Sequence, residues 1–312
     1  MSVIHADALS KRFRSTHVLK SVDLDVPVGA IYALVGPNGA GKTTTIKVLM
    51  NIIQPSAGFS EVLGVDSRRL SPKEFALIGY VSENQEMPEW MTVGYYLEFL
   101  RPFYPAWDRK LEEELVGQFD LLRDRKLRHL SRGMRMKAVL ASSLAYRPKL
   151  VVLDEPFTGL DALVRDELIG GMLARAENTT IFISSHDLAD IESFASHIAY
   201  LDGGRLQFSE ELESLSNRFR EIVLTFEESP PPVEPWPENW LRPESSGAVI
   251  RFIDQRFDPE RTPEQLRGVF PGLREIEISA MPLRSIFVAL AQSYKTAQQQ
   301  PKPEQAPVVR AS

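Results

Sequence analysis

The chain has 312 residues, a length typical of about two domains. Its 43% hydrophobic and 25% charged residues are ordinary for a globular protein. Its net charge of −6 excludes a global basic surface that would attract nucleic acid or anionic lipid. The absence of cysteine excludes disulfides and thiolate metal sites, and it fits a reducing cytoplasm.

Neither a secretion signal nor a membrane span is predicted. The segment Met1–Leu9 lacks the apolar core of a signal peptide. No stretch approaches the ~20 apolar residues that a membrane-spanning helix needs. We therefore expect any role at a membrane to depend on a partner chain.

The first two-thirds of the chain predict strands that alternate with helices. Residues up to about Gly29 are typical of short strands with a turn, because apolar residues alternate with polar ones around Leu24. The elements expected next are a strand at Ile31–Val35, a glycine-rich loop, a helix at Thr44–Asn51, a strand at Ile78–Val81, a helical segment from Trp90 to about Arg147, and strands at Leu150–Leu153, Thr180–Ile183 and Ile198–Leu201 before a turn at Gly203-Gly204. The apolar runs among them are typical of buried strands in a parallel sheet, so the fold class is expected to be α/β.

The character of the sequence changes near Leu212. Candidate strands follow at Ile222–Phe226, Val249–Ile253 and Ile276–Ser279, and one apolar helix face is formed by Leu283, Ile286, Phe287 and Leu290. The proline-rich Pro230–Pro237 excludes regular structure there. We interpret residues 213–292 as a small α+β domain and residues 293–312, rich in Gln, Pro and Lys, as a disordered tail.

The strongest chemical signal is the loop Gly36-Pro37-Asn38-Gly39-Ala40-Gly41-Lys42-Thr43. It matches the phosphate-binding pattern G-x-x-x-x-G-K-[ST] and stands between a predicted strand and a predicted helix. Glycines let the backbone approach phosphates, and the helix N-terminus offers N–H donors. Lys42 is expected to reach the β- and γ-phosphates and Thr43 to bind Mg²⁺. A glycine-rich turn that binds nothing is the alternative, but it gives the Lys-Thr pair no packing role.

Two adjacent carboxylates, Asp154 and Glu155, follow the apolar run Leu150–Leu153. Ligands of open α/β sheets lie at such carboxyl ends of strands. Asp154 is expected to hold Mg²⁺, and Glu155 is expected to activate the attacking water as general base. The alternative is an Asp-Glu pair that caps the next turn.

Several further segments resemble the remaining motifs of the ATP-binding-cassette (ABC) ATPases, in the right order. They are Leu130-Ser131-Arg132-Gly133-Met134 (the signature, usually Leu-Ser-Gly-Gly-Gln), Thr158-Gly159-Leu160-Asp161 (the D-loop), Ser184-Ser185-His186-Asp187 (the switch-histidine loop) and Ile78-Gly79-Tyr80-Val81-Ser82-Glu83 (the run into the Q-loop). The resemblance covers residues 1 to about 212. It implies a P-loop NTPase core with a mostly parallel sheet, an antiparallel β subdomain and a helical insert at about residues 86–147.

The resemblance also implies ATP and Mg²⁺ as ligands. The implied nucleotide-binding residues are Phe13, Gly36, Pro37, Asn38, Gly39, Ala40, Gly41, Lys42, Thr43, Thr44, Ser131, Gly133 and Asp161. The implied metal ligands are Thr43, Asp154 and Glu83, and the implied catalytic residues are Glu155, His186 and Lys42. His186 would hydrogen-bond the γ-phosphate, and Phe13 would lie under the adenine unless it is a core aromatic.

Each ATP site of this family is completed by the signature of a second subunit. The resemblance therefore implies a dimer, expected here to be a homodimer, in which Ser131 and Gly133 contact ATP held by the other copy. It further implies a separate membrane-spanning permease, which docks on the helical insert near Glu83–Met91, and attachment to the cytoplasmic face of the cell membrane. The family type is the single-cassette ATPase of bacterial drug and antibiotic exporters.

Two motifs depart from the family pattern, at three positions. The signature has Arg132 in place of a glycine and Met134 in place of the glutamine, and Arg132 could add a charge-assisted contact to phosphate. Glu83 stands where the family normally has glutamine, and Gln85 follows two residues later. Either Glu83 or Gln85 could do the work of the Q-loop residue.

Functions other than transport fit the sequence less well. Seven basic residues in Arg123–Lys137 permit a nucleic-acid interface, but no aromatic residues lie among them, so a solvated helix face is favoured and no nucleic acid is expected. A soluble ABC ATPase acting on ribosomes or DNA is the main alternative. Such proteins usually carry two cassettes or a long coiled coil, and this chain has neither. A binding module without turnover is disfavoured by the intact Lys42, Asp154, Glu155 and His186.

Overall fold

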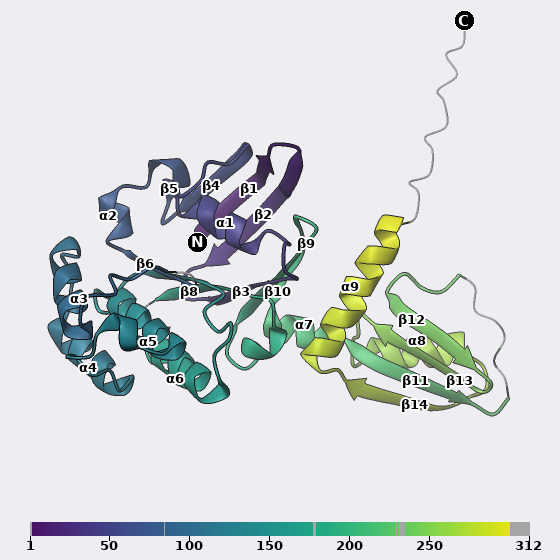
Figure 1. Cartoon of the computed structure of the whole chain (residues 1–312). Helices are drawn as coiled ribbons and strands as arrows, with labels where there is room; N and C mark the ends of the chain where they lie inside the picture. Colours follow the sequence, from purple (N-terminus) through teal and green to yellow (C-terminus); the bar gives the residue numbers. More distant parts are fainter. Residues whose placement is uncertain (1, 84, 177–178, 229, 231–234, 300–312) are drawn as a thin grey trace, which may run out of the picture. The chain divides into compact units, whose positions relative to one another are not determined.

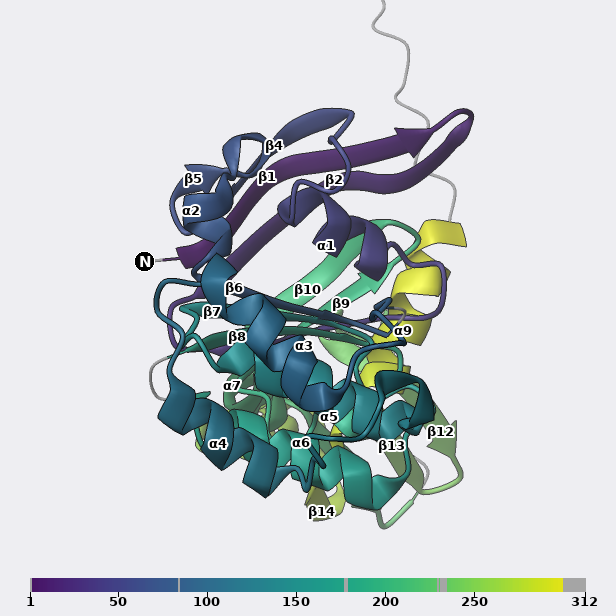
Figure 2. The ribbon, with the colours of Figure 1, turned by 60° about the vertical axis from the view of Figure 1, so that its left-hand side comes forward.

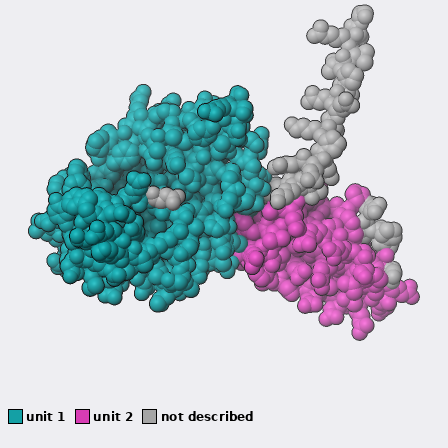
Figure 3. All heavy atoms as spheres, in the orientation of Figure 1, with its two compact units in different colours: residues 1–212 teal, residues 213–312 magenta. Residues whose placement is uncertain are grey.

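The computed structural model describes residues 2–299 except 84, 177–178, 229 and 231–234. The chain divides into two compact units, Met1–Leu212 and Glu213–Ser312 (Figure 3). We refer to them as unit 1 and unit 2.

The centre of unit 1 is a six-stranded sheet. Its strands, in spatial order, are β10 (Arg205–Glu211), β9 (His197–Asp202), β3 (Ile31–Val35), β8 (Thr180–Ser185), β7 (Leu150–Asp154) and β6 (Ile78–Ser82). All neighbours pair in parallel except β10, which runs antiparallel to β9 after the turn at Gly203-Gly204. Every residue of β3, β7 and β8 is buried. The predicted α/β class with a mostly parallel sheet is confirmed.

A second sheet of unit 1 is antiparallel. Its strands, in spatial order, are β2 (Thr16–Pro27), β1 (Ser2–Phe13), β4 (Ala57–Val62) and β5 (Val65–Asp66). Strands β1 and β2 have 12 residues each, so they are longer than the short strands expected. Helix α1 (Lys42–Leu49) lies between the two sheets (Figures 1 and 2) and buries Ile46 and Leu49 completely. It begins two residues before the predicted Thr44, so Lys42 is its first residue.

Helices cover the other face of the six-stranded sheet (Figure 2). They are α3 (Val93–Leu100), α4 (Arg109–Gln118), α5 (Arg132–Leu144) and α6 (Ala162–Leu173), and a short α2 (Pro72–Phe75) precedes β6. The first three lie in the segment predicted to be helical. Asp108, Ser131 and Asp161 each cap a helix N-terminus by accepting a backbone N–H bond.

A buried carboxylate joins the helices of this segment. The Glu112 side chain is 1% exposed and accepts hydrogen bonds of 2.8 Å from Arg101 and from Trp107 Nε1. Its Oε1 also lies 2.8 Å from Arg123 Nη1. Burial raises the pKa of Glu112, but these three donors outweigh it and the net pKa is lowered. Glu112 therefore stabilises the fold at neutral pH, and this contribution is lost as the pH falls through the depressed pKa.

We expect Glu112→Gln to lower the free energy of unfolding by about 3 kcal/mol, because two arginines lose the charge that balances them in a buried site. The variant should also unfold with less dependence on pH below neutrality. Denaturant titrations at several pH values measure both effects, and Glu113→Gln, at an exposed position of α4, is the matched control. Equal loss in the two variants would contradict the role of Glu112.

The described part of unit 2 holds an antiparallel sheet and three helices. The strands, in spatial order, are β12 (Trp240–Ser246), β13 (Val249–Asp254), β11 (Arg220–Phe226) and β14 (Leu273–Ala280); the helices are α8 (Arg261–Val269) and α9 (Leu283–Gln299), and α7 (Leu212–Arg218) precedes β11. Its core joins both kinds of element, with Leu224 and Phe252 of the sheet packed with Leu266 of α8. The three predicted strands and the helix at Leu283 are present, whereas β12 and α8 were not predicted.

The last helix of unit 2 is longer than predicted. Helix α9 continues to Gln299, so the expectation of disorder from residue 293 is wrong for residues 293–299. Residues 300–312 and four positions of the predicted proline-rich break, 231–234, lie outside the described residues. Among the helices of the described part of the chain, none combines the length and apolar character that a membrane-spanning helix requires.

Candidate functional site

A cavity of about 600 Å³ lies at the carboxyl ends of the parallel strands of unit 1. The loop after β3, and residues that follow β6, β7 and β8, all contribute to its walls. The predicted site residues that line it are Asn38, Gly39, Gly41, Lys42, Thr43, Thr44, Glu83, Glu155 and His186. Residues more than 100 positions apart in the sequence therefore meet at one edge of the sheet.

The glycine-rich loop is shaped to expose backbone N–H groups. Gly39 and Gly41 have φ of 81° and 114°, a region that other residues rarely adopt. A Cβ added at Gly36 would lie 2.0 Å from the Leu201 carbonyl oxygen, so only glycine fits there. Helix α1 starts directly after Gly41, and its first turn has no side-chain cap. Its free N–H groups and positive dipole end suit a phosphate.

Lys42 is a nearly buried residue of the cavity wall. Only 5% of the side chain is exposed. Its ammonium donates to the carbonyl oxygens of Gly36 (2.7 Å) and Pro37 (3.2 Å), and it lies 3.1 Å from Glu155 Oε1. The structure therefore keeps a positive charge beside the loop that is shaped for phosphates.

Glu155 contacts three side chains of the site. His186 Nδ1 lies 2.7 Å from Glu155 Oε2, and the Thr158 hydroxyl donates to the same oxygen at 3.3 Å. Burial raises the pKa of Glu155, but the bonds to His186 and Lys42 and their charges outweigh it, and the net pKa is below that of an ordinary glutamate. The residue has φ of 51°, an uncommon value for a non-glycine residue. An ionised carboxylate beside an imidazole can accept a proton from water.

Asp154 lies behind Glu155, with hydroxyl groups on one oxygen. Its Oδ1 accepts from Thr43 Oγ1 (3.0 Å) and from Ser184 Oγ (2.8 Å), and the residue is 4% exposed. Ser184 Oγ also accepts from the Glu155 N–H at 3.0 Å. Burial raises the pKa of Asp154 more than these hydroxyls lower it, so a nearby cation would stabilise its charged form. One carboxylate and one hydroxyl fit Mg²⁺, which usually takes one or two protein oxygens and completes its shell with water and phosphate.

Ser184 orients the Asp154 carboxylate and was missing from the predicted site residues. Asp154 is predicted to bind Mg²⁺, so we expect Ser184→Ala to raise the Mg²⁺ concentration for half-maximal ATPase activity by about tenfold, the usual effect of a residue that orients a metal ligand. The measurement is ATPase activity against Mg²⁺ at saturating ATP. Ser185→Ala is the matched control, since Ser185 Oγ donates to the Asp187 carbonyl instead. An unchanged Mg²⁺ requirement in Ser184→Ala would contradict this role.

Some predicted site residues lie away from the cavity walls. Ser131 caps helix α5 by accepting from Met134 N at 3.3 Å, and Gly133 packs beside Val164. Asp161 caps α6 by accepting from Val164 N. Phe13 is 45% exposed, with the Lys11 ammonium 5.0 Å from its ring centroid. Their contacts with nucleotide stay predictions.

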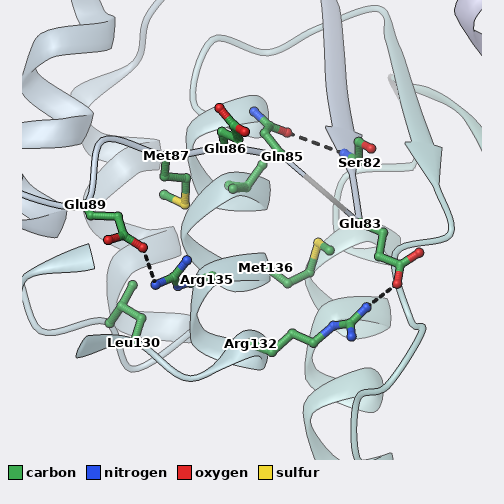
Figure 4. Close-up of a pocket in the computed structure, with 11 residues that line it drawn as sticks. Ser82, Glu83, Gln85, Glu86, Met87, Glu89, Leu130, Arg132, Arg135 and Met136 are labelled. Atoms are coloured by element: carbon green, nitrogen blue, oxygen red, sulfur yellow. Dashed lines mark hydrogen bonds and ion pairs between the residues drawn. The ribbon is translucent and has the colours of Figure 1, made fainter. Parts of the chain in front are cut away.

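Glu83 lies at the cavity edge, whereas Gln85 is not among the lining residues. The Gln85 side chain instead accepts from the Ser82 N–H at 3.4 Å. The Glu83 carboxylate accepts a hydrogen bond from Arg132, and Figure 4 shows the two side chains pointing toward one another. Glu83, rather than Gln85, is thus placed to face a ligand of this cavity.

The basic run of residues 123–137 is largely paired with carboxylates. The pairs are Arg123 with Glu112, Arg132 with Glu83, Arg135 with Glu89 and Lys137 with Glu167. The interpretation of this run as a solvated helix face is wrong in part, because α5 begins only at Arg132 and Lys137 on it is buried.

Comparison with known proteins places this geometry in a family. Residues 19–158 match the family model described as ABC transporter. The ABC transporter ATP-binding protein YtrB of Bacillus subtilis is 32% identical over 227 residues, which cover 72% of this chain and 77% of YtrB. The chain belongs to the ABC transporter ATP-binding proteins. As a member of this family, it binds and hydrolyses ATP, and its activity powers transport.

Another relative and two solved structures are also similar to this chain. The daunorubicin resistance ATP-binding protein DrrA2 of Streptomyces coeruleorubidus is 33% identical, with 69% of this chain and 68% of DrrA2 covered. A solved ATP-binding subunit of an ABC transporter is 26% identical, with a TM-score of 0.63 over 69% of this chain and 92% of that chain. The ATP-binding cassette MJ0796, solved as a dimer bound to ADP and Pi, is 22% identical with a TM-score of 0.60, and it covers 67% of this chain and 98% of its own. This last likeness concerns the fold alone.

Proposed function

We propose that the protein is the ATPase subunit of an exporter, works as a homodimer with Mg²⁺ and ATP, and drives a separate membrane permease from the cytoplasmic face. The observation that supports it best is the cavity of Lys42, Glu155 and His186, in which an ionised carboxylate lies beside an imidazole and a phosphate-binding loop. Mg²⁺, when bound through Thr43 and Asp154, would offset phosphate charge.

Each residue of the cavity has a separate task in this proposal. Lys42 and the N–H groups of the loop hold the β- and γ-phosphates. Glu155 accepts a proton from the attacking water, and its lowered pKa keeps it in the base form at neutral pH. His186 orients the Glu155 carboxylate through the 2.7 Å contact and faces the same space.

The dimer is proposed because the two halves of the site are separate within one chain. Ser131 and Gly133 stand at the start of α5 and do not line the cavity of Lys42. A second copy, related by a two-fold axis, would bring its Ser131 to the γ-phosphate and receive the same contact in return. ATP hydrolysis would remove this contact and open the dimer, and the difference in binding would move the permease.

A groove beside the cavity is the proposed permease contact. It is lined by Gln85, Met87 and Met136 among others, and Figure 4 shows it between α5 and the chain after β6. Exposed aromatic side chains lie nearby in the sequence on and around α3; they are Trp90 (64%), Tyr95 (47%), Phe99 (45%) and Phe103 (63%). Clustered exposed aromatics mark contact surfaces for other proteins. Export is proposed because DrrA2 is named for daunorubicin resistance.

Purification from native membranes tests this function. We expect a protein with several membrane-spanning segments to accompany the chain, and Phe99→Asp to reduce that recovery without changing ATP affinity. Copurification of ribosomes or DNA in place of a membrane protein would overturn the transporter assignment. It would favour the alternative, a soluble ABC ATPase.

A further inference from the structure

The pair Glu83–Arg132 unites one departing position from each of the two motifs that differ from the family pattern. The Arg132 guanidinium donates to Glu83 Oε1 (Figure 4), and Glu83 lies on the wall of the nucleotide cavity. Both side chains are partly exposed, at 48% for Arg132 and 28% for Glu83. Such pairs add little to the free energy of unfolding. We therefore expect the pair to act on the cavity and not on the stability of the fold.

The cavity has more acidic than free basic groups near the phosphate loop. Glu83 and Glu155 line it, and Asp154 lies behind them. Lys42 is already paired with Glu155 at 3.1 Å. A nucleoside triphosphate brings several more negative charges, so an uncompensated Glu83 would repel it. Arg132 supplies the charge that balances Glu83.

The chain holds both partners in place. The Glu83 N–H donates to the Asp154 carbonyl at 3.0 Å, which fixes Glu83 beside the end of β7. Arg132 is the first residue of α5, where the helix dipole disfavours a cation, and the first turn of α5 has no acidic residue. Glu83 provides the negative charge that this helix end lacks.

Gly159 leaves room for the guanidinium. A Cβ added at Gly159, whose φ is 70°, would lie 2.9 Å from Arg132 Nη1. Arg132 thus touches the segment between β7 and α6 as well as the residue after β6. One side chain contacts two segments that border the cavity.

We propose that Arg132 is a positioning residue of its own subunit, which neutralises Glu83 and fixes its carboxylate at the edge of the nucleotide cavity. Arg132 then compensates for Glu83, because the carboxylate at position 83 is tolerated beside the nucleotide only in the presence of Arg132. This inference rests on the proposed nucleotide site. In this proposal Arg132 acts on Glu83 of the same chain. The charge-assisted contact suggested by the sequence would instead join Arg132 to the phosphate of ATP.

The test is a double-mutant cycle read by ATP affinity. Calorimetric titration with ATP is carried out on four proteins: the parent chain, Arg132→Gln, Glu83→Gln and the double variant. The titrations contain EDTA and use protein concentrations at which sedimentation shows monomers. We expect Arg132→Gln to weaken ATP binding by about fivefold. Glu83→Gln should bind ATP at least as tightly as the parent, and the double variant should recover parent affinity. Arg135→Gln is the matched control. Arg135 lies on the same helix and pairs with Glu89 at 3.3 Å, but Glu89 does not line this cavity.

Two results would overturn the inference. One is unchanged affinity in Arg132→Gln. The other is a loss that Glu83→Gln does not rescue, which would mean that Arg132 affects ATP binding by a route other than Glu83. Thermal unfolding without nucleotide checks that all variants fold. If the parent itself bound no ATP, the proposed nucleotide site would be wrong as well. If the parent bound ATP but the effects of the Arg132 and Glu83 substitutions were simply additive, only this inference would be wrong.

Discussion

Glu155→Gln is expected to lower the rate of ATP hydrolysis by about 100- to 10 000-fold, the usual contribution of a general base. The amide keeps the size of the carboxylate and can still contact Thr158 and His186, but it cannot accept a proton from water. ATP binding should persist, because the ammonium of Lys42 keeps its bonds to the carbonyl oxygens of Gly36 and Pro37. If dimers form around ATP, the unhydrolysed nucleotide should let them accumulate.

Three measurements on Glu155→Gln separate these effects. Single-turnover kinetics report the chemical step, equilibrium titration reports ATP affinity, and size-exclusion chromatography with Mg²⁺ and ATP reports the dimer. Glu192→Gln is the matched control, since Glu192 is exposed and does not line the cavity. Full residual hydrolysis in Glu155→Gln would remove Glu155 as the base, and a dimer that never appears would count against the shared site.

The parts of the site that are contiguous in sequence were predictable. The loop ending in Lys42 and Thr43, and the carboxylates after Leu150–Leu153, each carry their chemistry within a few residues. A strand before the loop and a helix after it confirmed the context. Local motifs need no knowledge of how distant segments pair.

The supporting contacts depend on pairing between segments. Ser184 reaches Asp154 because strands β7 and β8 pair with these two residues in register, 30 positions apart in the chain. Arg132 reaches Glu83 across 49 positions. Neither separation follows from periodicity. The signature serine and the switch histidine could be named only through family resemblance.

The errors in unit 2 have local causes. Strand β12 has the sequence WLRPESS and offers no clear alternation of apolar residues. Helix α8 buries only Thr262 and Leu266, so its apolar face is narrow. The Gln- and Ala-containing end of α9 was interpreted as disordered from its polarity. Both residue types favour helix, and they extend a helix that is already nucleated by Leu283–Leu290.

Lys42→Ala is expected to weaken ATP binding by about 100-fold or more, as for the loss of a charge-assisted bond in a nearly dry site. Two effects of the substitution contribute to this loss of ATP affinity. The phosphates lose a cation that is 5% exposed, and Glu155 loses the charge 3.1 Å away that helps to lower its pKa. Calorimetric titration with ATP measures the loss, and Lys47→Ala, at an exposed position of the same helix, is the control.

The effect of Lys42 on Glu155 allows the loss of a charge in Lys42→Ala to be distinguished from a disrupted loop structure. Adding Glu155→Gln to Lys42→Ala removes a carboxylate that would otherwise face the phosphates without a partner. ATP affinity should then recover in part, by about fivefold. A loop that had merely collapsed would show no such recovery, and unchanged affinity in Lys42→Ala alone would refute the assignment of the loop as the phosphate site.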